Sequence, residues 1–193
     1  MIIFVQNNLN LERSEQELVR RDKLKQLRAL GIDPYPAAAF SSNANSATIR
    51  NEFVEGKQVT IAGRLMSRRI QGKASFAELQ DSQGRIQIYF NRDILCPTED
   101  KSMYNDVYKK LLDIGDIIGI SGTLFTTQVG EKTVQVESLY VLSKSLRPLP
   151  LPKTDADGNT YDSFSDPEQR YRMRYVDLIV NPEVKDTFLK RTK

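Results

Sequence analysis

Apolar and polar residues alternate between Gln58 and Asn91, and a turn motif interrupts the alternation. A period of two is typical of strands that bury one face, because successive side chains point to opposite faces of a sheet. The pattern predicts strands at 58–69, 74–81 and 85–91. The sequence Asp81-Ser82-Gln83-Gly84 predicts a hairpin turn between the last two.

Two further strands are predicted at 116–125 and 132–142, after a helix at about 101–113. Three strands, a helix and two strands follow one another as in the OB-fold, a five-stranded Greek-key barrel. An SH3-like barrel is the alternative, but it has no helix of this length between its third and fourth strands. The predicted fold is therefore mainly β, an OB-fold barrel with an N-terminal helix and a C-terminal linker and helical extension.

The segments around the barrel differ in character. A capping box at Ser14 to Glu17 predicts the start of the N-terminal helix, whose basic face is either solvated or an auxiliary RNA contact. The prolines of Arg147-Pro148-Leu149-Pro150 predict a stiff linker. The expected organisation is a disordered lead (1–13), a helical extension (14–56), the OB-fold domain (57–146), a linker with a polar loop (147–165) and a truncated start of a further domain (166–193).

Composition excludes several kinds of site. The chain has one cysteine, Cys96, and no histidine among its 193 residues. Cysteine and histidine zinc motifs and histidine-dependent catalytic triads are therefore excluded, and we expect no metal site and no catalytic residue. The apolar opening ends at Gln6, too short to span a membrane, so a soluble cytoplasmic protein without a membrane partner is expected.

Basic charge is concentrated in the predicted sheet. The chain carries a formal charge of +3, whereas residues 59–92 contain six basic and two acidic residues. A local basic patch is the expected footprint of phosphate binding. Strand parity points Val59, Ile61 and Leu65 inward, and therefore Arg64, Met66 and Arg68 outward.

The same parity points Phe76 and Glu78 outward from the second strand, and Arg85, Gln87 and Tyr89 outward from the third. An outward aromatic ring with basic neighbours is suited to stacking the bases of single-stranded nucleic acid. The candidate RNA-binding residues on this face and its bordering loops are Arg64, Arg68, Arg69, Lys73, Phe76, Glu78, Arg85, Gln87 and Glu131.

Structural alternatives remain open at this point. Phe76 is also compatible with packing under the N-terminal helix, Gln87 with a solvated strand position, and the arginines with scattered solubilising charge. Glu131 by itself is uninformative.

Three longer motifs carry a family resemblance. The segments RRIQGKASFAELQD, KSLRPLP and RYRMRYVDL resemble lysyl-tRNA synthetases of the bacterial class II type, from about Glu15 onward. Aspartyl- and asparaginyl-tRNA synthetases share the barrel and a related RYxDL ending, but the RPLP and GKASF segments favour the lysine enzyme. The resemblance implies an anticodon-binding domain whose partner is the anticodon stem-loop of tRNA-Lys.

The resemblance also implies residue roles. Phe76 matches a phenylalanine that stacks on the anticodon, and Gln87 a glutamine that reads its central uracil. Glu131 matches a glutamate at the first anticodon position, and Arg68 an arginine on the same surface.

The resemblance implies that the chain is part of a longer parent enzyme, which is expected to use ATP and Mg²⁺ and to be a homodimer. Its second and third class II motifs have no match here, so the chain alone is expected to need no cofactor and to be inactive in aminoacylation.

Two other functions remain as alternatives. One is a sequence-tolerant binder of single-stranded DNA or RNA that uses the same barrel. The other is a module that docks a partner protein on the exposed face.

Overall fold

The computed structural model describes residues 14–150, 153–154, 160–161 and 164–192. The predicted lead at 1–13 and the predicted polar loop at 155–159 lie outside the described residues. The chain divides into two compact units, one ending at Arg147 and one beginning at Pro148.

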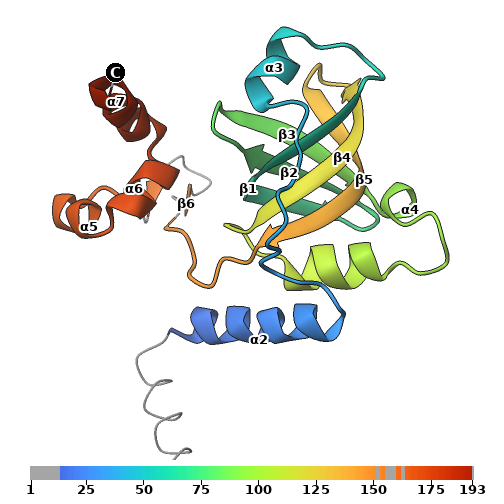
Figure 1. Ribbon diagram of the computed structural model, residues 1–193, viewed down its shortest axis with the longest axis horizontal. Helices are drawn as coiled ribbons and strands as arrows, with labels where there is room; N and C mark the ends of the chain where they lie inside the picture. The colour runs from blue at the N-terminus through green and yellow to red at the C-terminus, as the bar shows by residue number, and fades with distance from the viewer. Residues whose placement is uncertain (1–13, 151–152, 155–159, 162–163, 193) are drawn as a thin grey trace, which may run out of the picture. The chain divides into compact units, whose positions relative to one another are not determined.

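Five strands form a closed barrel in the order β1-β2-β3-β5-β4 (Figure 1). All neighbouring strands are antiparallel except β3 and β5, which run parallel. This arrangement confirms the predicted fold class. The strands are β1 (Gln58–Gln71), β2 (Ala74–Gln80), β3 (Arg85–Asn91), β4 (Ile117–Thr126) and β5 (Lys132–Ser143).

One strand departs from the predicted alternation. The register between β1 and β2 shifts from Leu65 opposite Leu79 to Ser67 opposite Glu78, so Met66 is an extra residue in a β-bulge. Met66 is only 3% exposed, and its predicted outward orientation is wrong. Beyond the bulge the alternation of β1 is inverted, so Arg68, which was predicted to point outward, is paired with Ala77 of β2.

A short π-helix, η1 (Met103–Leu111), closes one end of the barrel. The Leu112 N–H donates to the Val107 carbonyl five residues earlier, which is the π-helical pattern. Its buried Tyr108 stacks on Phe90 of β3 with ring centroids 3.9 Å apart. The helix predicted at 101–113 is therefore present in a wider form, while the short helix α4 (Arg92–Leu95) was not predicted.

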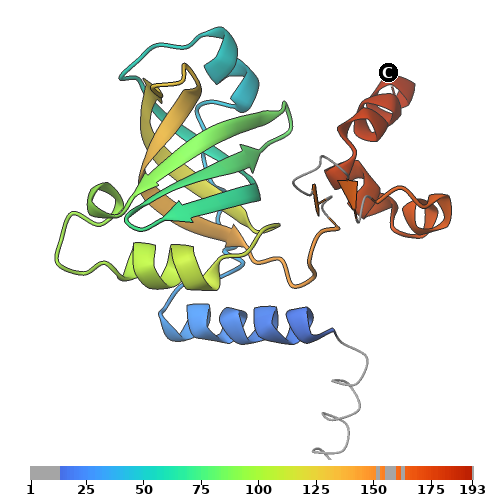
Figure 2. The same cartoon turned by 180° about the vertical axis from the view of Figure 1, so that it is seen from behind.

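The N-terminal helix α2 (Glu15–Ala29) packs against η1 outside the barrel (Figure 2). Ser14 caps it by accepting the Glu17 N–H, as the capping box predicts. The buried Arg20 donates to the carbonyls of Ile114 (3.0 Å) and Ser145 (3.1 Å). Arg20 therefore stabilises helix docking and is not part of a solvated face.

An ionic network joins α2 to both ends of the β4–β5 hairpin. The Nζ of Lys144, which is 0% exposed, lies 2.8 Å from Asp116 and 2.6 Å from Asp113. Lys23 of α2 binds Asp113 at 2.5 Å. Burial raises the pKa of Asp116; at Asp113 burial acts in the same direction, but the hydrogen bonds from Lys144 and Lys23 outweigh it and lower the pKa.

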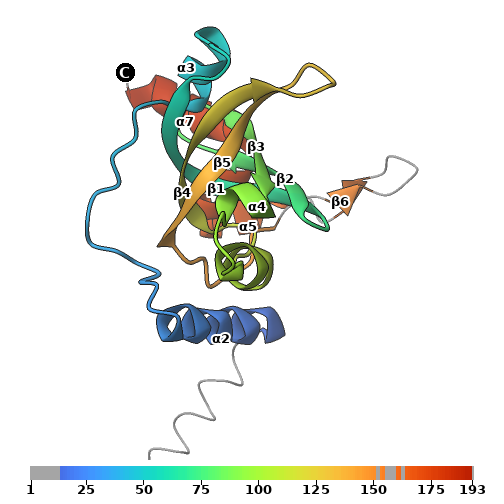
Figure 3. The same ribbon diagram turned by 90° about the vertical axis from the view of Figure 1, so that its right-hand side faces the viewer.

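An extended segment leaves α2 and crosses the outside of the barrel toward α3 (Ser46–Asn51) (Figure 3). Phe40 of this segment packs on Gly119, where a Cβ atom would lie 2.6 Å from the ring. The carboxylate of Asp81, in the β2–β3 turn, accepts from the backbone N–H and the hydroxyl of Ser46 at 2.5 and 2.6 Å. These two contacts fix the start of α3 beside that turn.

In the part of the second unit that the structure describes, a two-stranded sheet is followed by three helices. Asp177 is 0% exposed and accepts hydrogen bonds from Arg170, Arg174 and Asn181. Asp166 caps the first helix, where a helix start was predicted. The elements are β6 (Lys153–Thr154), β7 (Thr160–Tyr161), α5 (Pro167–Arg172), α6 (Arg174–Val180) and α7 (Pro182–Thr192).

The described residues contain neither a helix able to span a membrane nor a side-chain cluster able to hold a metal ion. Among them, no helix is long and apolar enough to cross a membrane. The same part of the chain holds no group of three or more acidic or cysteine side chains arranged to hold a metal ion.

Candidate nucleic-acid interface

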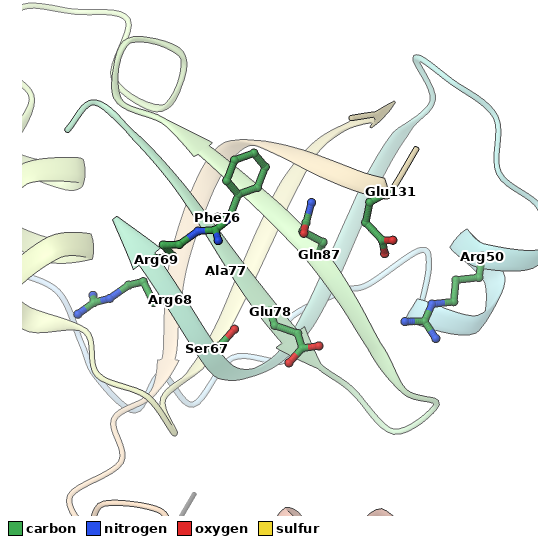
Figure 4. A pocket seen from close by; sticks show the side chains of 9 residues that line it. All are labelled: Arg50, Ser67, Arg68, Arg69, Phe76, Ala77, Glu78, Gln87 and Glu131. Atoms are coloured by element: carbon green, nitrogen blue, oxygen red, sulfur yellow. The ribbon is translucent and has the colours of Figure 1, made fainter. Parts of the chain in front are cut away.

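A pocket of about 340 Å³ lies on the outer face of β1, β2 and β3, with further walls from α3 and the β4–β5 loop (Figure 4). Six of the nine predicted residues line it: Arg68, Arg69, Phe76, Glu78, Gln87 and Glu131. Three other lining residues were not selected from the sequence: Arg50, Ser67 and Ala77.

The bulge at Met66 decides which arginine accompanies Phe76. Arg69 is paired directly with Phe76 across β1 and β2, and its guanidinium carbon lies 6.0 Å from the ring centroid. Arg68 is paired with the inward Ala77, and its guanidinium donates to the Tyr108 carbonyl and lies 5.5 Å from the Tyr108 ring centroid. The predicted outward orientation of Arg68 is therefore wrong, and Arg69 takes the place expected for it.

Three aromatic rings form a row on this outer surface. Phe76 contacts Tyr89 at 4.9 Å between centroids, and Tyr89 contacts Phe125 edge-on at 5.8 Å. All three side chains are half-buried, so each keeps an exposed part. Parity already pointed Tyr89 outward, and the alternation around Leu124 would have identified Phe125 in the same way.

A hydrogen-bonded chain orients Gln87. Its amide Nε2 donates to Thr133 Oγ1 at 2.9 Å, and this hydroxyl donates to the Glu131 carbonyl at 3.1 Å. Gln87 is thus held in place and is not an ordinary solvated residue. An amide has two N–H donors and a carbonyl acceptor, and the Thr133 contact uses one donor.

Glu131 is presented by a closed hairpin loop. The backbone N–H of Thr127 donates to the Glu131 carbonyl, and the Glu131 N–H donates to Thr127 Oγ1, both at 3.0 Å. Gly130 completes the turn with a φ of +84°, a conformation that favours glycine. The exposed Glu131 carboxylate therefore stands at the rim of the pocket, beside Gln87 (Figure 4).

Arg85 and Glu78 form an ion pair at 3.1 Å on the outer face, and Gln80 accepts from Arg85 Nε at 2.9 Å. The positive charge of Arg85 therefore offsets the negative charge of Glu78, one of the two carboxylates that line the pocket. Two of the basic groups that line the pocket, Arg69 and Arg50, come from separate elements.

Three predicted residues do not line the pocket: Arg64, Lys73 and Arg85. Arg64 donates to the Gly115 carbonyl at 2.7 Å, and burial lowers its pKa against the opposing effect of Asp116. Lys73 is exposed in the loop between β1 and β2, and in OB-folds this loop borders the usual binding groove.

Residues 59–142 match the tRNA anticodon family model, described as an OB-fold nucleic acid binding domain. This part of the chain, which forms the five-stranded barrel, is therefore similar to the class of OB-fold nucleic-acid-binding domains. Over most of its length the chain is also similar to the lysine–tRNA ligases, which are enzymes. These matches confirm the predicted resemblance to lysyl-tRNA synthetase.

The individual matches are strong. The chain is 69% identical over 180 residues to the lysine–tRNA ligase of Christiangramia forsetii, covering 93% of the chain and 32% of that protein. It is 61% identical to that of Porphyromonas gingivalis (94% of the chain, 32% of the relative). It is 46% identical to that of a Thermoanaerobacter species (97% and 36%). The chain thus spans about a third of the length of these relatives.

Proposed function

We propose that this chain binds the anticodon loop of tRNA-Lys on the outer face of its barrel. The observation that carries the proposal is the pocket that brings Phe76, Arg69 and Gln87 together beside Glu131. An exposed ring accepts a stacked base, a guanidinium binds phosphate, and a fixed amide reads a base edge. All three are requirements for recognising an unpaired, specific sequence.

In the proposed complex, the central anticodon uracil stacks on Phe76. The Gln87 amide pairs with the N3–H and O4 of this base through its oxygen and its second N–H. Glu131 accepts an N–H of the neighbouring base at the first anticodon position. In this complex, the neutral and acidic side chains recognise the bases, and Arg69 binds a phosphate.

The broader activity belongs to a longer protein in this proposal. A protein that contains this chain would attach lysine to tRNA-Lys, as the ligase relatives' name suggests. In this proposal it would use ATP and Mg²⁺ and would act in the cytoplasm. The contribution of the present residues is selection of the tRNA by its anticodon.

Binding of a labelled tRNA-Lys anticodon stem-loop, followed by fluorescence anisotropy, tests the proposal. We expect the uridine-containing loop to bind more tightly than a loop with cytidine at the central position and than deoxythymidine of equal length. Equal affinity for all three would favour the sequence-tolerant binder. Absence of RNA binding over a range of salt concentrations would favour a protein-docking module.

A further inference from the structure

Arg50 is the lining residue of the pocket that comes from outside the barrel. It lies in the last turn of α3, and Figure 4 shows its side chain at the end of the pocket remote from Arg68. Resting on the proposed RNA-binding function, we infer that Arg50 binds a backbone phosphate next to the two nucleotides that Gln87 and Glu131 read.

Three sets of contacts hold Arg50 in this position. Its Nη2 donates to the Arg85 carbonyl of β3, and its own backbone carbonyl accepts from Lys132 Nζ of β5 at 2.6 Å. The helix that carries it is anchored through Ser46 to Asp81. A six-residue helix has little stability by itself, so these tertiary contacts determine where the guanidinium lies.

The chemistry of the guanidinium fits a phosphate. Arginine has five N–H donors in a planar fork, and one hydrogen bond to the Arg85 carbonyl leaves the fork able to bind a second acceptor. The Arg50 residue is exposed, so an anion reaches it without a large desolvation cost. The Arg85 carbonyl also orients the side chain before RNA arrives.

The charge arrangement favours a phosphate over a base at this position. Glu78 and Glu131 also line the pocket, and Glu78 is already paired with Arg85. Arg69, beside Phe76, and Arg50 supply basic groups that come from different walls of the pocket. A single strand that stacks on Phe76 and passes Gln87 brings a following phosphate toward Arg50.

The experiment measures anticodon stem-loop affinity as a function of salt for wild type, Arg50→Ala, Arg50→Gln and Arg50→Lys. The control is Lys110→Ala, which removes an exposed basic residue that is paired with Asp106 and does not line the pocket. We expect Arg50→Ala and Arg50→Gln to lose about tenfold in affinity, the value of one charged hydrogen bond. We also expect them to lower the salt slope by about 0.7, the value for one phosphate on a single strand.

The remaining variants separate the explanations. Arg50→Lys should keep the salt slope because it keeps the charge, and Lys110→Ala should stay within about twofold of wild type. Arg50→Gln retains a donor for the Arg85 carbonyl, so it carries the test if Arg50→Ala melts early.

Unchanged affinity and slope in Arg50→Gln would overturn the inference, as would a changed base preference with an unchanged slope. Wild-type chain that binds no stem-loop would instead overturn the proposed function itself.

Discussion

Arg69 and Phe76 face each other across the β1–β2 pair, with the guanidinium carbon 6.0 Å from the ring centroid. This pairing exists because the extra residue Met66 turns the following part of β1 over. The bulge gives the two adjacent arginines different environments, since Arg68 binds the Tyr108 carbonyl on the other side of the strand. Different consequences of mutation follow for the two residues.

Arg69→Ala should weaken stem-loop binding and lower the salt slope by about 0.7. Arg68→Ala should instead reduce the free energy of unfolding by about 1.5–3 kcal/mol, because it removes a charged hydrogen bond to the backbone of η1. Urea unfolding and salt-dependent anisotropy on both variants check this. The reverse assignment, with Arg68 governing the slope and Arg69 the stability, would show that the bulge does not position these side chains as described.

Phe76→Ala should weaken stem-loop binding by about 1–3 kcal/mol, the value of one stacked base. The loss of stability should be smaller than for a buried aromatic, because the ring is half-buried and rests on Tyr89. Affinity measured together with the melting temperature checks this. A matched control is Phe90→Ala, which removes a ring that is 0% exposed and should destabilise the chain by about 3–5 kcal/mol. A sharp fall in melting temperature with unchanged affinity for Phe76→Ala would contradict the stacking role.

Gln87→Ala should reduce discrimination between uridine and cytidine at the central position more than it reduces overall affinity, because base contacts specify and phosphate contacts position. Thr133→Val should give a weaker version of the same change, since it removes only the hydroxyl that orients the Gln87 amide. Affinities for the two loops, measured for wild type and both variants, decide the matter. Equal discrimination in all three proteins would remove Gln87 from base recognition.

Lys144→Ala should reduce the free energy of unfolding by about 3–5 kcal/mol, because it leaves buried carboxylate charge without its partner. Lys23→Ala should have an effect of about 1 kcal/mol or less, since the Lys23 side chain is 22% exposed and Asp113 keeps Lys144. Denaturant unfolding of the two variants provides the comparison. Similar losses for both would mean that the network acts as a surface ion pair.

Tyr108 should make the domain sensitive to alkaline pH. Burial raises the pKa of its phenol from 10.0 to about 12, against the lowering effects of the Ser75 hydrogen bond and of Arg68. Below pH 10 the phenol is neutral in both states, and its contribution to stability is complete. As the pH rises from 10 toward 12, the unfolded chain ionises first, so the free energy of unfolding should fall by up to about 2–3 kcal/mol.

Tyr108→Phe provides the test of this pH dependence. The variant should be less stable at neutral pH, because it loses the 2.6 Å hydrogen bond between Tyr108 and Ser75. Its stability should then fall less steeply than that of wild type over the alkaline range. Parallel pH profiles for the two proteins would show that Tyr108 does not carry the effect.

The sequence by itself determined the barrel and the central part of the site. Strand order, the Asp81–Gly84 turn and a period of two are local properties, and they place Phe76 and Gln87 on the outer face of two regular strands. Within such strands the pleat alternates without exception, so parity is sufficient.

Only the tertiary structure decided the features that depend on contacts with distant segments of the same chain. The bulge at Met66 lies where the pairing register between β1 and β2 shifts. This one extra residue exchanges the faces on which Arg68 and Arg69 lie. Arg50 reaches the pocket because its helix is anchored through Ser46 to Asp81, which lies 35 residues after Ser46 in the sequence. Arg20 is buried because its guanidinium donates hydrogen bonds to the carbonyl of Ile114, before β4, and to that of Ser145, after β5. Such contacts join positions that are far apart in the sequence, so a local pattern of polar and apolar residues does not predict them.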